Sequence, residues 1–152
     1  MTCFSLAQRF VGIREIAGGR DHPLIQYCFM LCGFDSETHD EVPWCSAFVQ
    51  LPPFLLGLPR SRSARARHNL LVGLPIELDV AEAKNDLVII TRGSGQQPGP
   101  EDTDAQGHVG WYAGLHAGKI LILGGNQSNG VTIEAFDHTR ILGIRRLARA
   151  IS

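Results

Sequence analysis

Residues 107–126, "GHVGWYAGLHAGKILILGGN", decide the fold because they predict two β-strands joined by a short turn. If the turn spans 115–119, His108 faces Asn126 across the resulting hairpin. A register that is one residue shorter brings Gln127 within diagonal reach of His108 instead, because a shift of one residue exchanges the two faces of a strand. Both registers put an amide side chain near the histidine.

Short apolar runs separated by turn residues continue around this hairpin, whereas apolar residues before residue 75 recur at helical spacing. A helical half followed by consecutive strands predicts an α+β fold with an antiparallel sheet of about five strands. We expect a single domain over 1–152, with the helical half at about 1–74 and the sheet half at about 75–152. The expected helices are 5–13, 22–33, 43–51 and 63–71, and the expected strands are 86–91, 107–114, 119–126, 131–136 and 141–146.

The composition is that of an ordinary soluble globular protein of 152 residues, with 44% hydrophobic and 19% charged residues. A formal net charge of −1 gives no global attraction to nucleic acid or anionic membranes. No apolar run reaches the ~18 residues of a membrane-spanning helix, and the first residues lack the basic and apolar regions of a signal peptide. We therefore expect a monomer that is synthesised in the cytoplasm without a signal peptide, binds no nucleic acid and inserts into no membrane.

Cys45 lies in "DEVPWCSAFVQLPPF" (40–54), where a helix is predicted to begin at Pro43. In the first turn of a helix, free backbone N–H groups and the positive end of the dipole favour a thiolate and can hold an oxyanion. A cysteine also packs well as a small apolar residue, so this stretch alone leaves a purely structural role open.

A thiol nucleophile needs a base, and His108 is the strongest candidate among the six histidines. It opens a strand-like segment directly after the long polar loop 92–107. Asn126, or Gln127 in the shorter register, carries an amide oxygen that can accept from the ring N–H and fix its tautomer. An ordinary histidine beside a turn-forming "GGNQSNG" is the alternative. Glycines near the histidine, Gly107 among them, suggest close approach of a substrate backbone.

Two further clusters carry weaker signals. Cys28 and Cys32 share one predicted helix face, but no second ligand pair at zinc spacing accompanies them, so buried thiols are favoured. The four arginines within 60–67 indicate a solvated helix face or, alternatively, contact with an anionic polymer. The loop 92–107 is typical of a lid or a surface insertion. We predict no metal and no organic cofactor.

Seven segments, in this order, resemble the NlpC-like and CHAP-like cysteine peptidases of the papain-like clan, specifically a small single-domain group found in phages and bacteria. The segments are "VGIREI" (11–16), "DEVPWCSAFV" (40–49), "SARAR" (63–67), "DLVII" (86–90), "GHVGWYAG" (107–114), "LGGNQSN" (123–129) and "RILGIRR" (140–146). The resemblance covers most of the chain. It implies a papain-like α+β fold in which a cysteine at a helix start packs against an antiparallel sheet that carries the histidine.

The resemblance also implies an activity, that of a peptidoglycan hydrolase (a cysteine endopeptidase or amidase) cleaving an amide bond of the stem peptide within one catalytic domain. The implied catalytic residues are Cys45 as nucleophile, His108 as base and Asn126 as orienter, with Gln127 as the alternative orienter, and the cleft residues are Trp44, Gly107 and Tyr112. A phage lysin, a tail-associated hydrolase or a delivered toxin would act on the wall or periplasm after release or delivery. The alternatives are a thiol acyltransferase, a peptidase on a non-wall substrate, and an inactive wall-binding module.

Two features depart from the family pattern. Pro52 and Pro53 fall inside the cysteine helix, where a proline removes a backbone hydrogen bond and clashes with the preceding turn. We therefore expect this helix to kink or end near Gln50 or Leu51, more than a turn beyond the cysteine. The loop 92–107 is longer than the family pattern predicts, which leaves substrate specificity open.

Overall fold

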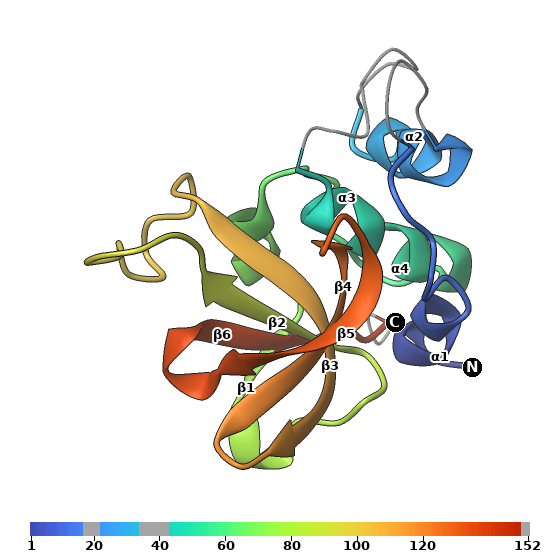
Figure 1. The fold of residues 1–152 in the computed structure, drawn as a ribbon. Helices are drawn as coiled ribbons and strands as arrows, with labels where there is room; N and C mark the ends of the chain where they lie inside the picture. Colours follow the sequence, from blue (N-terminus) through green and yellow to red (C-terminus); the bar gives the residue numbers. More distant parts are fainter. Residues whose placement is uncertain (17–21, 34–42, 150–152) are drawn as a thin grey trace.

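The computed structural model describes residues 1–16, 22–33 and 43–149, in which helices pack against a six-stranded antiparallel sheet with strand order β1-β6-β2-β3-β4-β5 (Figure 1). The helices are α1 (Cys3–Gln8), α2 (Pro23–Met30), α3 (Cys45–Val49) and α4 (Leu51–Leu56), with 3-10 helices η1 (Ala66–Leu71), η2 (Leu78–Val80) and η3 (His138–Arg140). The strands are β1 (Leu74–Ile76), β2 (Asp86–Thr91), β3 (Gly107–His116), β4 (Lys119–Gln127), β5 (Gly130–Asp137) and β6 (Ile141–Arg146). Within the described residues, no helix has the length and apolar character needed to cross a bilayer.

The predicted α+β class is confirmed, with six strands rather than about five. The added strand, β1, is the three-residue segment "LPI" paired with β6, and it is too short to show an alternating pattern. The helix expected at 63–71 is the shorter 3-10 helix η1, because Arg65 before it is extended (φ −88°, ψ 121°). The first helix ends at Gln8, and the chain then turns at Gly12 (φ 101°), whose N–H donates to the Val131 carbonyl at 3.0 Å.

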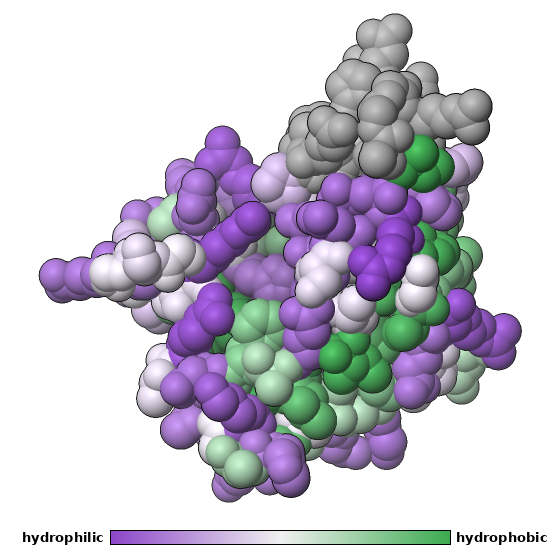
Figure 2. Space-filling model, viewed as in Figure 1, coloured by the Kyte–Doolittle hydropathy of each residue, from purple (hydrophilic) through white to green (hydrophobic). Residues whose placement is uncertain are grey.

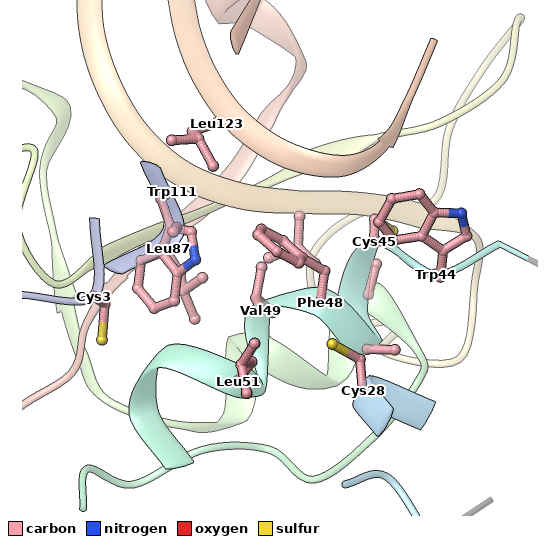
Figure 3. Close-up of a cluster of buried hydrophobic side chains, with 14 of the residues drawn as sticks. Cys3, Cys28, Trp44, Cys45, Phe48, Val49, Leu51, Leu87, Trp111 and Leu123 are labelled. Atoms are coloured by element: carbon pink, nitrogen blue, oxygen red, sulfur yellow. The ribbon is translucent and has the colours of Figure 1, made fainter. Parts of the chain in front are cut away.

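The sheet is buried on both faces. Leu87 and Ile89 of β2 belong to the cluster that packs against the helices, whereas Val88 and Ile90 belong to a second cluster. This alternation follows from the two-residue period of a strand, and burial of both faces explains why β2 is an unbroken apolar run. Figure 3 shows the layer between helices and sheet, which includes Phe48, Val49, Leu51, Leu87, Trp111 and Leu123.

The proline pair turns the expected third helix into two short ones. α3 ends before Gln50 and α4 begins after it, with Gln50 itself in right-handed helical conformation (φ −73°, ψ −25°). Pro52 and Pro53 lie in the first turn of α4, where a missing N–H costs no helical hydrogen bond. The predicted end near Gln50 is confirmed, and the turn that carries Cys45 is intact.

Arg67 fixes the connection between β2 and β3. Its side chain is fully buried (0% exposed), so the interpretation of the arginine cluster as a solvated face is wrong for this residue. The guanidinium donates to four backbone carbonyls, those of Gln106 (2.8 Å), Pro98 (3.0 Å), Gly99 (2.7 Å) and Asp102 (3.3 Å). Charged donors make the stronger class of hydrogen bond, so this side chain holds the loop against η1.

Replacing Arg67 with Met is expected to lower the free energy of unfolding by about 3 kcal/mol, since it leaves four buried carbonyls without their charged donor. Arg65→Met is the matched control, because Arg65 is exposed and its ion pair with Asp104 spans 3.7 Å. An exposed pair of this kind contributes less than about 1 kcal/mol. Urea unfolding of the two variants measures the difference, and equal midpoints would contradict the assigned role.

Candidate active site

Cys45 is the first residue of α3 and is almost completely buried (3% exposed). Trp44 precedes it as the N-cap, so the helix begins two residues later than Pro43, the expected first helical residue. The cysteine nevertheless keeps its place in the first turn, at the end of α3 that faces the sheet (Figure 3). The first N–H groups of a helix have no intrahelical acceptor, and Cys45 lies at this end of α3.

Trp44 fixes the entry to this helix. Its indole Nε1 donates to the Glu15 carboxylate at 2.6 Å, and its ring packs edge-on against Phe48 with centroids 6.4 Å apart. The ring also lies against Gly125 of β4, where any Cβ would overlap it. Trp44 is fully buried, so it packs beneath the site and does not line the cleft, where it was expected.

Tyr112 is also displaced from its expected position in the cleft. It packs with the second apolar cluster, which does not contain Cys45. Gly107, by contrast, lines a surface hollow together with Cys45. A Cβ at Gly107 would lie 2.9 Å from Cγ of Arg67, so this glycine lets the buried arginine pass beneath the start of β3.

His108 is the second residue of β3 and is 7% exposed. Its Nε2 lies 2.8 Å from Oε1 of Gln127, and its other face lies near the Phe136 ring, with centroids 5.5 Å apart. An interaction with the Cys45 side chain is among the causes that raise the pKa of His108, so the two side chains are neighbours. Because Gln127 engages Nε2, Nδ1 is the ring nitrogen that remains for the cysteine sulfur. The structure thus brings Cys45, His108 and Gln127 together, with the imidazole between the thiol and the amide.

Asn126, the orienter expected in the longer register, is not the ring's partner. Trp111 pairs with Leu123, which is the register that would bring Asn126 opposite His108. β4 bulges between Gly124 and Gln127, however, and Asn126 sits in the bulge with a left-handed backbone (φ 58°). The extra residue turns Gln127 toward the histidine. The bulge is therefore the reason why Gln127, and not Asn126, contacts the ring.

The hairpin turn also differs from the expected 115–119. Ala117 and Gly118 alone form it, both with positive φ (50° and 75°), as a tight two-residue hairpin turn requires. A register shift between Tyr112 and Gly114 absorbs the difference. Between this shift and the site, the register of β3 and β4 therefore remains the predicted one, with Trp111 opposite Leu123.

Gln127 is itself held firmly. It is buried (4% exposed), and its Nε2 donates to the backbone carbonyls of Ile122 (3.2 Å) and Thr132 (2.9 Å). An amide whose nitrogen is committed to two carbonyls must present its oxygen to the histidine. Gln127 therefore accepts from the ring Nε2–H, which leaves Nδ1 to exchange a proton with Cys45.

The electrostatics of the pair favour charge separation. Burial alone would raise the pKa of the Cys45 thiol, but the hydrogen bond and charge of His108, the Val109 N–H and the charge of Arg92 together lower it. Burial would lower the pKa of His108, but the hydrogen bond and charge of Cys45 and the bond from Gln127 outweigh it and raise the pKa. Both shifts favour a thiolate beside an imidazolium.

Two surface hollows flank the pair. One, of about 280 Å³, is lined by Cys45, Gly107 and the segments 64–66 and 104–106. The other, of about 220 Å³, is lined by His108 and residues of β4 and β5. In Figure 2 the protruding loop at the left, which connects β2 to β3 in Figure 1, is mainly hydrophilic. Arg92 lines both hollows, and sequence reasoning missed it, although it directly follows β2.

The zinc alternative gains no support. Across 1–16, 22–33 and 43–149, no three His, Cys, Asp or Glu side chains gather as metal ligands would. Burial raises the pKa of Cys28 to about 12 and that of Cys32 to about 11, so both remain neutral thiols at physiological pH.

The chain resembles a solved structure of NlpC1 from Trichomonas vaginalis, with a TM-score of 0.55 and 18% sequence identity over 97% of the chain. The fold is therefore NlpC-like. The chain spans 44% of the length of that NlpC1 chain. No model of a known protein family matches the sequence, and no curated protein matches it. At this identity the likeness concerns the fold, and the catalytic roles rest on the site itself.

Cys45 is expected to react with iodoacetamide much faster than the other cysteines at pH 6–7, because a lowered thiol pKa leaves more thiolate at that pH. The internal controls are Cys3 and Cys28, with pKa values of about 12, and Cys32, with a pKa of about 11. His108→Ala should raise the pKa of Cys45 and slow its alkylation. Peptide mass spectrometry measures the rates, and four equally slow cysteines would contradict an activated thiolate.

Gln127→Ala is expected to lower the pKa of His108, because the bond from Gln127 is one of the interactions that raise it. Gln127→Glu keeps an acceptor oxygen and should retain a raised pKa. Asn126→Ala is the matched control, since its side chain does not hold the ring. NMR titration of the His108 ring tests all three variants, and a shift in Asn126→Ala alone would reverse the assignment of orienter.

Proposed function

We propose that the chain is a cysteine amidohydrolase that cleaves an amide bond of the peptidoglycan stem peptide. The observation that carries the proposal is the buried group of Cys45, His108 and Gln127. In this group the pKa of the thiol is lowered and that of the imidazole is raised. The resemblance of "PWCSAFV", "GHVGWYAG" and "LGGNQSN" to NlpC-like peptidases, together with the NlpC-like fold, supports the wall as the substrate.

In the proposed acylation step, the Cys45 thiolate attacks the carbonyl carbon of the scissile amide and a tetrahedral oxyanion forms. In this proposal a backbone N–H at the start of α3 donates to the oxyanion. His108, protonated on Nδ1, gives its proton to the amine as the carbon–nitrogen bond breaks, leaving a thioester on Cys45. Gln127 keeps the ring in the orientation that this transfer needs.

In the proposed deacylation step, neutral His108 takes a proton from water as its oxygen attacks the thioester carbonyl. The carbon–sulfur bond then breaks, the carboxylic acid leaves, and the thiolate–imidazolium pair returns. All groups used in both steps belong to the chain or to water. We place this activity in the wall or periplasm, where a phage lysin, a tail-associated hydrolase or a delivered toxin would act.

Cys45→Ala should reduce the release of wall fragments at least about a thousandfold, since the variant lacks the thiol that forms the proposed acyl-enzyme. Cys32→Ala is the matched control and should retain activity, because Cys32 lies outside the site. Mass spectrometry of muropeptides identifies the cut bond, and an added amine in the products would indicate a transferase instead. Wall clearing by Cys45→Ala at the wild-type rate would refute the proposal.

A further inference from the structure

Among the residues that the structure describes, Arg92 is the one charged side chain shared by the two hollows that flank Cys45 and His108. It directly follows Thr91, the last residue of β2, and it is exposed. The cation lies close enough for its charge to act on both groups: it helps to lower the pKa of Cys45, and it opposes the larger interactions that raise the pKa of His108. A substrate that runs from one hollow to the other must therefore pass Arg92 next to the scissile bond.

The other charged residues that line the hollows already have partners. Arg140 donates to the Thr91 carbonyl at 2.6 Å and lies over the Phe136 ring. Glu134 accepts from the hydroxyls of Ser128 (2.9 Å) and Thr132 (2.6 Å).

On the cysteine side, Asp104 lies 3.1 Å from Nε2 of His68 and 3.7 Å from Nη1 of Arg65. Arg92, by contrast, has no hydrogen-bond or ion-pair partner among the residues that the structure describes. An arginine left open at this position offers a planar set of donors that matches a carboxylate.

We propose that Arg92 is a specificity-determining residue, which binds a free carboxylate on the substrate residue that flanks the scissile amide and thereby favours carboxylate-bearing peptides over their carboxamide forms. The proposal rests on the amide hydrolysis proposed above and adds the chemistry of the group next to the cut. A carboxamide keeps the shape of a carboxylate but lacks its charge and one of its acceptor oxygens, so it forms the weaker contact with a guanidinium.

Binding without turnover separates this proposal from the catalytic one. The probes are two synthetic stem tetrapeptides that differ only in having glutamate or its α-carboxamide form at the second position. With Cys45→Ala, calorimetry should show about tenfold tighter binding of the glutamate peptide. In the double variant Cys45→Ala/Arg92→Gln that preference should fall to about one. Cys45→Ala/Arg9→Gln is the control that removes an exposed arginine absent from both hollows, and it should keep the preference.

Equal binding of both peptides to Cys45→Ala, no binding of either, or an undiminished preference in the Arg92→Gln double variant would each overturn the role of Arg92. Turnover by the wild type is measured separately with the same peptides. Cleavage of both peptides at equal rates would support the proposed amide hydrolysis and contradict the role of Arg92. Preferential binding of the glutamate peptide without any cleavage would support the role of Arg92 and contradict the proposed hydrolysis. In a catalytically active chain, Arg92→Gln should raise KM for the glutamate peptide and change kcat far less.

Discussion

The bulge at Gly125 and Asn126 is the constraint on which the rest of the site depends. Gly125 has no side chain, so the indole of Trp44 can lie against the strand and fix where α3 begins. Asn126 takes the left-handed conformation that a bulge demands, and the chain then presents Gln127 to His108. One irregularity in one strand thus sets the position of the cysteine helix and the orientation of the histidine together.

Comparison of the buried cysteines shows how strongly the surroundings of Cys45 must act to lower its pKa. Burial raises the pKa of Cys3 and Cys28 to about 12, and Cys45 is buried in the same apolar cluster. The direction of its shift is reversed only because a histidine, a backbone N–H and a nearby cation oppose desolvation. The same core therefore holds thiols whose pKa is raised and one whose pKa is lowered, and the neighbouring His108 is the main cause of the difference.

The sequence carries most of the fold and part of the site. The change from helical to two-residue periodicity near residue 75 predicts the α+β class, and the motif around Cys45 predicts a cysteine in a first helical turn. The sequence could not decide between Asn126 and Gln127 as the partner of His108. A bulge changes the face of the sheet to which a side chain points, but it leaves the apolar pattern unchanged. Composition also misplaces Arg67, since charge usually indicates exposure and nothing local shows that four carbonyls will surround it.

The clamp formed by Arg67 has a consequence for how the loop between β2 and β3 can evolve. All four of its acceptors are main-chain carbonyls, which almost any residue provides in the same place. The side chains of the loop are therefore free to diversify while the path of the loop stays fixed. A lineage that retains Arg67 and Gly107 can change the side chains of this loop beside Cys45 to suit new substrates while the backbone of the loop keeps its path.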